Sequence, residues 1–188
     1  RLVKDNFSKL FLRGSKRTMV IPHLPAIGAI VLPNVGGWVS SYYNRESIKT
    51  WYETLKRPDW RPPNKAFGPV WTSLYCGMGY ASYLVWKHGD GFNGLAKGPL
   101  ILYSSQLALN WAWSPIFFGA RQLKWSLVEI IALDINVVLC AFAFYNIHKP
   151  AGLLMLPYLA WLGLATALNY VIYRDNKALP DKEDPKSK

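Results

Sequence analysis

Long apolar tracts alternate along this chain with short segments rich in Lys and Arg. A helix needs roughly 20 residues to cross about 30 Å of hydrocarbon. Because hydrocarbon offers no partner to an unpaired backbone group, and because the tracts are continuously apolar rather than alternating, they predict helices and not the strands of a barrel. The sequence therefore predicts an all-α, polytopic membrane protein, a bundle of five transmembrane helices. The expected spans are about 22–43, 66–86, 98–120, 125–147 and 150–173.

These spans account for more than half the chain and leave no room for a separate soluble domain. We expect one transmembrane domain over residues 19–176, followed by a polar tail over 177–188. Residues 1–18 are basic and nearly free of acidic side chains, and Met19 stands just before the first span. This segment is expected to be a targeting extension or sequence upstream of the true start.

The longest connection, residues 44–65, is itself partly apolar. Ile48, Trp51, Tyr52 and Leu55 recur at helical spacing and predict a short amphipathic helix, followed by an extended proline-rich segment. The alternative is a surface loop at the lipid headgroups, with its Trp side chains as interface anchors.

Basic residues are distributed unequally between the two sides that five spans define. Loop 44–65, the 121–124 turn and the C-terminus hold thirteen of the twenty-two Lys and Arg residues. Since cytosolic flanks carry the excess of Lys and Arg, the C-terminus is expected to face the cytosol.

The composition shows an unusually large number of tryptophan residues. The 188 residues are 51% hydrophobic with a formal charge of +11, and nine of them are Trp. There is no phosphate-binding loop, dinucleotide fingerprint or nucleophile elbow, so nothing supports hydrolysis or phosphoryl transfer. His23, His88 and His148 lie near span ends without partners at ligand spacing, so we expect no metal site and no cofactor. The basic charge is explained by membrane topology, and no nucleic-acid partner is expected.

A few polar residues fall inside the spans, where they tend to face the bundle interior. Asn110 and Asn169 are expected to hydrogen-bond across helix interfaces. Glu129 is close enough to the cytosolic interface to reach water or pair with Lys124 or Arg121. Asp134 lies deeper, and the alternatives for it are a protonated carboxyl group, or a hydrogen bond to Asn136 or to a neighbouring helix.

Several motifs closely resemble the translocator protein family, also called the peripheral benzodiazepine receptor or tryptophan-rich sensory protein family. The resemblance covers residues 19–176, and the sequences of these motifs are typical of animal members of the family. It rests on Pro58-x-Trp60-x-Pro62-Pro63, Met78-Gly79-Tyr80, Pro157-Tyr158-Leu159-Ala160-Trp161 and, above all, the run from Gln106-Leu107-Ala108-Leu109-Asn110-Trp111 to Phe118-Gly119.

The resemblance implies a five-helix, often dimeric receptor or carrier in the mitochondrial outer membrane, and not an enzyme. It implies binding of cholesterol, of porphyrins and haem, and of benzodiazepine-type and isoquinoline-type drugs, in a pocket that loop 44–65 covers. By position, the matching pocket residues are Ser41, Trp51, Phe67, Gly68, Val70, Trp71, Asn110, Trp125, Ala165 and Leu168. Leu168, Tyr170 and Arg174 match a sterol-recognition segment, which also fits a weak sterol-contact pattern in the sequence.

Two alternatives to a receptor or carrier stay open at this point. Trp71 and Trp161 match tryptophans tied to porphyrin breakdown in the family, which would imply a photo-oxidative activity. The protein could also be a membrane scaffold whose ligands are incidental. Ser41, Asn44 and Asp134 depart from the family pattern, and the loose Ala108/Ala112 pair leaves dimerisation open.

Overall fold

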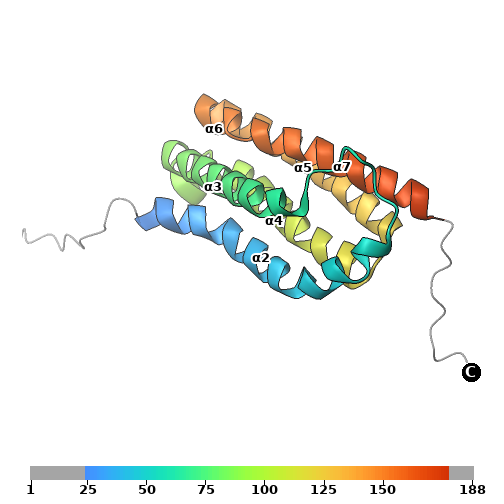
Figure 1. Ribbon diagram of the computed structural model, residues 1–188. Helices are drawn as coiled ribbons and strands as arrows, with labels where there is room; N and C mark the ends of the chain where they lie inside the picture. The colour runs from blue at the N-terminus through green and yellow to red at the C-terminus, as the bar shows by residue number, and fades with distance from the viewer. Residues whose placement is uncertain (1–23, 178–188) are drawn as a thin grey trace, which may run out of the picture.

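Five long helices lie side by side in the computed structural model, which describes residues 24–177 (Figure 1). They are α2 (Leu24–Lys49), α3 (Asn64–His88), α4 (Lys97–Ser114), α5 (Leu123–Ile147) and α7 (Leu156–Asn176). Short helical turns connect them: η1 (Tyr52–Thr54), η2 (Gly91–Asn93), η3 (Pro115–Gly119) and α6 (Lys149–Leu153). Within the described residues there is no strand, and the predicted all-α fold of five helices is confirmed. The predicted segments 1–18 and 178–188, and His23, lie outside the described range.

Neighbouring helices pack in a simple order. α2 packs mainly on α3, α4 on α5, and α5 on α7. Residues 50–63, which we call the lid, lie at the same end of the bundle as the C-terminus of α7 (Figure 1). α6 and the N-terminus of α2 lie at the opposite end.

Proline residues explain where the observed helices depart from the predicted spans. The span predicted over 98–120 changes from α-helix to the wider turn η3 at Pro115, and the span predicted over 150–173 is interrupted between α6 and α7, just before Pro157. Proline has no backbone N–H and its ring crowds the carbonyl four residues earlier, so each break falls where the α-helical ladder cannot continue.

The expected amphipathic helix after the first span is wrong. α2 instead continues to Lys49 and includes Ile48, and only the single turn η1 follows before an irregular chain reaches Pro63. The apolar residues at helical spacing are buried by tertiary packing against the bundle, which does not require them to form a helix of their own.

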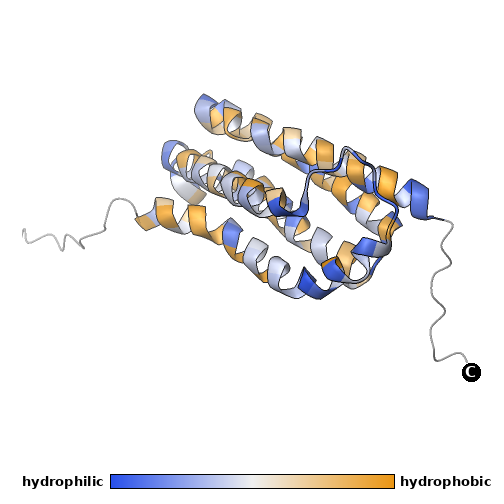
Figure 2. Ribbon diagram, viewed as in Figure 1, coloured by the Kyte–Doolittle hydropathy of each residue, from blue (hydrophilic) through white to orange (hydrophobic). Residues whose placement is uncertain are grey.

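The helices are suited to lipid on the outside. Three of them, Leu24–Lys49, Leu123–Ile147 and the combined α6–α7 segment Lys149–Asn176, are long and apolar enough to cross a membrane. Hydrophilic residues gather at the ends of the bundle and in the lid, whereas the middle is mostly apolar (Figure 2). The outer face of α5 exposes Val128, Ile131, Ile135, Val138, Leu139 and Phe142. These features are those of a membrane protein.

α2 approaches α3 closely at Gly79. A Cβ at this position would lie 2.3 Å from the carbonyl oxygen of Ala29, which is closer than real Cβ atoms come. Ala29 stands four residues before Pro33, whose missing N–H leaves that carbonyl without its helical partner. The glycine therefore permits a backbone contact beside the proline break.

We expect Gly79→Ala to destabilise the α2–α3 contact by about 1–3 kcal/mol, because the new methyl group must displace backbone. The matched control is Gly77→Ala, where an added Cβ would meet its nearest neighbour at 3.9 Å. Thermal unfolding of both variants in the same detergent measures the difference. Equal midpoints for the two variants would contradict the close approach.

Candidate ligand-binding cavity

A cavity of about 310 Å³ lies in the half of the bundle nearest the lid. Side chains from α2, η1, α3, α4, η3, α5 and α7 line it, and most of its wall is apolar. The aromatic part of the wall consists of Trp38, Tyr52, Phe67, Trp71, Tyr75, Trp113, Phe117, Phe118 and Trp161. Concave apolar surfaces with few polar groups are the usual form of small-molecule sites.

The lid covers this cavity through an aromatic cluster. The Trp51 and Tyr52 rings lie edge-on to Phe117, with ring centroids 5.6 Å and 6.1 Å apart. Leu55 belongs to the same buried cluster, which reaches Leu168 on α7. The lid is thus held by burial of its own apolar side chains over the cavity.

The wider turn η3 positions the centre of that cluster. The N–H of Ala120 donates to the carbonyl oxygen of Pro115 at 2.8 Å, a bond between residues five apart rather than four. Such π-type turns locally redirect side chains and often occur at functional sites. Here the turn carries Phe117, which is only 2% exposed, into contact with both lid aromatics and with Trp113, whose ring centroid lies 4.8 Å away.

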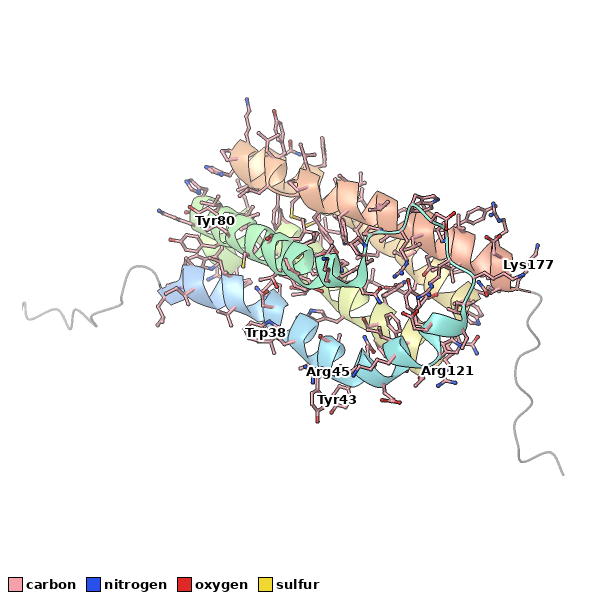
Figure 3. The ribbon with its side chains drawn as sticks, in the orientation of Figure 1. Trp38, Tyr43, Arg45, Tyr80, Arg121 and Lys177 are labelled. Atoms are coloured by element: carbon pink, nitrogen blue, oxygen red, sulfur yellow. The ribbon has the colours of Figure 1, made fainter. Side chains whose placement is uncertain are left out.

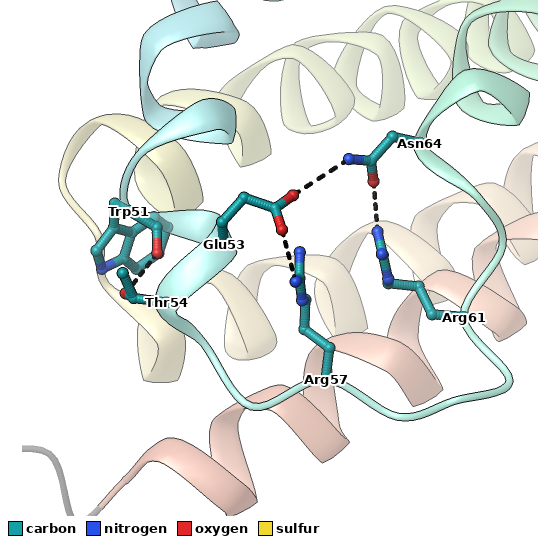
Figure 4. A network of polar contacts seen from close by, with 6 residues as sticks. All are labelled: Trp51, Glu53, Thr54, Arg57, Arg61 and Asn64. Carbon is teal, nitrogen blue, oxygen red and sulfur yellow. Dashed lines mark hydrogen bonds and ion pairs between the residues drawn. The ribbon is translucent and has the colours of Figure 1, made fainter.

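A polar network stabilises the lid internally (Figure 4). Arg57 Nη2 donates to Glu53 Oε2 at 2.7 Å, and Arg61 donates to the side chain of Asn64 at the start of α3. The guanidinium groups of Arg57 and Arg61 also lie 5.1 Å and 5.7 Å from the centroid of the Tyr52 ring, within the range of cation–π attraction.

The pKa values of Glu53 and Tyr52 in the lid are shifted for different reasons. The hydrogen bond from Arg57 is the main reason that the pKa of Glu53 lies below its ordinary value of 4.5. The pair therefore contributes to lid stability above about pH 4.5, and this contribution is lost as the pH falls through the lowered pKa. Burial raises the pKa of the Tyr52 hydroxyl, so that group stays neutral at physiological pH.

Asn110 joins three helices beside the cavity. The Tyr75 hydroxyl on α3 donates to Asn110 Oδ1 at 2.7 Å, and Asn110 Nδ2 donates to the Tyr158 hydroxyl on α7 at 2.9 Å. Asn110 is 7% exposed, so the network is shielded from solvent. The sequence-based expectation of an amide bond between helices is confirmed.

Asn169 makes a second interhelical connection, as expected. Its Oδ1 accepts a hydrogen bond from Trp113 Nε1 at 3.2 Å, and its Nδ2 donates to the carbonyl oxygen of Leu123 at 3.4 Å. α7 is thereby tied to the end of α4 and to the start of α5. The bond also fixes the plane of the Trp113 indole in the cavity wall.

Most of the residues predicted for the pocket from the family resemblance line the cavity. These are Ser41, Phe67, Gly68, Trp71, Asn110, Ala165 and Leu168, and Trp161 joins them. The Trp161 ring lies edge-on to Phe67 at 5.5 Å, and its Nε1 is buried without a hydrogen-bond partner among the described residues.

The cavity wall does not include Trp51, Val70 or Trp125. Trp51 lies on the lid behind Phe117, with the Arg121 guanidinium 5.7 Å from its ring centroid. Val70 is half-buried one position before Trp71, which places it about 100° around α3. Trp125 is 60% exposed near the start of α5. The structure places these three side chains outside the cavity wall, and their part in ligand binding stays a prediction.

The predicted sterol segment is divided between two environments. Leu168 is buried and lines the cavity, whereas Tyr170 is 52% exposed. Arg174 is exposed and pairs with Asp175, with Nε donating to Oδ1 at 2.7 Å. Residues two apart on a helix differ by about 200°, so Leu168 and Tyr170 cannot face the same ligand inside the cavity.

Of the row of residues that α2 presents to the cavity, sequence reasoning assigned only Ser41 to the pocket and missed the others. Asn34, Gly37, Ser41, Asn44 and Ile48 all line it and recur three or four residues apart. This spacing is one helix face, and it was visible in the sequence as the polar positions of the first span. An added Cβ at Gly37 would lie 2.6 Å from the Tyr75 ring, so glycine allows α2 to approach α3 here.

The two acidic residues of α5 have different surroundings. Thr166 Oγ1 on α7 donates to Asp134 Oδ2 at 2.7 Å, so of the alternatives for Asp134 the structure shows the bond to a neighbouring helix. Glu129 was expected to reach water or pair with Lys124 or Arg121. Instead, both of its carboxylate oxygens are buried without a hydrogen-bond partner among the described residues. The burial of α5 against its neighbours prevents Glu129 from reaching the interface.

At the opposite end of the bundle, the structure brings two of the histidines together. The rings of His88 and His148 stack with centroids 4.1 Å apart. His88 Nδ1 lies 2.8 Å from the carbonyl oxygen of Leu84. The described residues contain no cluster of three or more His, Cys, Asp or Glu side chains able to hold a metal ion.

Comparison with known proteins agrees with this architecture. Residues 29–174 match the profile of the TspO/MBR family. The chain belongs to this family. The translocator protein of Homo sapiens is 47% identical over 158 residues, which cover 84% of this chain and 94% of the human protein. The translocator protein of Bos taurus is 44% identical over 159 residues, covering 85% and 94% of the two chains.

A more distant relative extends the family beyond animals. The tryptophan-rich protein TspO of Archaeoglobus fulgidus is 39% identical over 150 residues, covering 80% of this chain and 95% of the archaeal protein. Identity to the two mammalian proteins is higher, in agreement with the animal-type motifs in the sequence.

The Asn110 network gives a test of how the cavity is held together. We expect Asn110→Leu to lower the free energy of unfolding by about 1–3 kcal/mol, because two buried tyrosine hydroxyls lose their partner. Thermal unfolding in detergent measures the loss. A triple variant with Tyr75→Phe and Tyr158→Phe added should regain part of it, since no orphaned hydroxyl remains. A triple variant less stable than the single one would contradict this reading.

Proposed function

We propose that the chain is a membrane receptor or carrier that takes a flat, largely apolar ligand, such as a sterol or a tetrapyrrole, into the cavity beneath the lid. The single observation that carries the proposal is the largely aromatic cavity of about 310 Å³ in the half of the bundle nearest the lid. Family membership and the names of the translocator proteins support it.

The chemistry of the wall favours recognition by shape. The amides of Asn110 and Asn169 are engaged with protein groups, so they offer little to a ligand. Trp161 Nε1 and Asn34 Oδ1 are buried wall atoms without a hydrogen-bond partner in the part of the chain that the structure describes. A ligand with a rigid ring system and one or two polar atoms therefore suits the site better than a charged or extensively hydroxylated one.

The cavity volume is near the lower end of the range for sites that hold drug-sized ligands, roughly 300–1,000 Å³. A large ring system such as a porphyrin would therefore need α2 or the lid to move outward. Because α2 presents small side chains here, an outward shift would leave few large residues in the path of the ligand.

Orientation and location are part of the proposal. Arg45, Arg121 and Lys177 mark the lid end of the bundle (Figure 3). Among the described residues, only the pairs Arg57–Glu53 and Arg174–Asp175 form salt bridges, so most cations at this end are free. The positive-inside rule places that end, and the C-terminus, on the cytosolic side. The family resemblance favours the mitochondrial outer membrane.

Filling the cavity without disturbing the fold tests the ligand site. An added Cβ at Gly68 has no neighbour within 4 Å, and the residue lines the cavity. We expect Gly68→Leu to weaken the binding of cholesterol, protoporphyrin IX and haem by at least about tenfold, because the added side chain occupies cavity space that the ligand would fill. Quenching of Trp fluorescence in detergent measures the affinities.

Gly163→Leu is the matched control. Gly163 also lies within a helix and has no neighbour within 4 Å of an added Cβ, but it does not line the cavity. It should bind all three probes like the unsubstituted chain. Equal binding by both variants would place the ligand elsewhere, and failure of every probe to bind the unsubstituted protein would refute the proposal.

Light-driven oxidation of a bound porphyrin by dioxygen is a second candidate function, favoured by the position of Trp71 and Trp161 in one cavity wall. It predicts that the porphyrin absorption band decays under light and air, stays constant in darkness, and is preserved in a Trp161→Phe variant that still binds porphyrin. Absorption spectra of the protein–porphyrin complex distinguish the cases. Decay at an equal rate in the variant would exclude a role for Trp161.

A further inference from the structure

Asn176 connects the lid to the end of α7. Its Oδ1 accepts a hydrogen bond from the backbone N–H of Lys56 at 3.0 Å, and its Nδ2 donates to the backbone carbonyl oxygen of the same residue at 3.0 Å. The side-chain amide thus pairs with both backbone groups of one lid residue, as a neighbouring strand would.

This amide is held in position before it meets the lid. Asn176 Nδ2 also donates to the carbonyl oxygen of Ile172 at 2.8 Å, within the last turn of α7. The residue is only 3% exposed, so water does not compete for these bonds while the lid is closed. Opening the lid at Lys56 requires all the bonds between the two residues to break together.

The other polar contacts of the lid do not cross the cavity. Glu53 and Arg57 bond each other, Arg61 bonds Asn64 at the start of α3, and Thr50 bonds Glu46 in α2. The lid connects α2 to α3 in the sequence. Among the residues that the structure describes, Asn176 is the only one on another helix whose side chain hydrogen-bonds the lid. The aromatic cluster holds the lid by burial of apolar surface. The hydrophobic effect opposes removal of the lid but does not fix its exact position, because it is non-directional.

We propose that Asn176 is a positioning residue that latches the lid to α7 and sets the rate at which a ligand enters and leaves the cavity. The inference rests on the proposed function, because it takes the cavity to be a ligand site reached beneath the lid. Asn176 does not line the cavity. Its loss should therefore change the rates of exchange more than the equilibrium affinity, as expected for a gate.

Trypsin reports the state of the latch without any ligand. Trypsin cleaves after Lys and Arg but not before proline, and Arg57 and Arg61 are each followed by proline. Within residues 50–63 the only cleavable bond is therefore Lys56–Arg57, whose carbonyl Asn176 holds. We expect Asn176→Ala in the full-length, detergent-purified chain to be cut there on the order of tenfold faster, because two hydrogen bonds are lost.

Two controls separate latch opening from general unfolding. Asn146→Ala changes an exposed asparagine in the last turn of α5 for which no side-chain hydrogen bond is found among the described residues, and it should be cut like the unsubstituted chain. Cleavage after Lys97, at the opposite end of the bundle, should be equal in all variants. Asn176→Asp keeps the acceptor for the Lys56 N–H but loses the donor, and should give faster cleavage even if the alanine variant folds poorly.

Stopped-flow Trp quenching with protoporphyrin IX then tests the gate. Association and dissociation in Asn176→Ala should both accelerate about tenfold, while the dissociation constant changes less than about threefold. Unchanged cleavage at Lys56 in both Asn176 variants would overturn the latch. Faster cleavage with unchanged ligand rates would overturn its role as a gate. If protoporphyrin does not bind the unsubstituted chain, both the proposed function and the role of Asn176 in ligand exchange are refuted. The trypsin experiment still tests whether Asn176 holds the lid.

Discussion

The amide of Asn110 is the interaction on which the arrangement of the cavity most depends. It accepts from Tyr75 and donates to Tyr158, so three helices are fixed at one buried point. In an apolar interior an unpaired amide or hydroxyl is costly, and these three residues satisfy one another. The rings of both tyrosines then support Trp71, whose indole centroid lies 5.3 Å and 6.1 Å from theirs.

The lid is held by both apolar burial and directional hydrogen bonds. Its apolar residues close the cavity by burial, but burial alone allows many positions of the chain. Hydrogen bonds, which are directional, select one of these positions. They are the bonds among Glu53, Arg57, Arg61 and the adjacent Asn64, and the pairing of Asn176 with Lys56. The contacts that hold the helices of the cavity wall together are therefore different from those that hold the lid. A ligand site with a releasable cover can exchange its ligand without unfolding the bundle.

Much of this architecture could be predicted from the sequence. Span length and the cost of unpaired backbone groups in lipid were enough to predict five helices. The breaks at Pro115 and Pro157 follow from proline chemistry, although the spans were drawn through them. The expected roles of Asn110 and Asn169 were also correct, because an amide in an apolar span has few alternatives to a bond across helices.

The sequence by itself determined the fold class and the helix-forming tracts, since both follow from local composition and spacing. Of the aromatic wall, the family resemblance indicated Phe67, Trp71 and Trp161. Only the tertiary structure decided which face of each helix meets the cavity. It turned Trp125 and Tyr170 outward and left Glu129 without a hydrogen-bond partner within residues 24–177. It also stacked His88 on His148 and joined Lys56 to Asn176 across 120 residues. The physical reason is that rotation about a helix axis and contacts between distant segments are set by the packing of all the helices together, and that packing has no local signature in the chain.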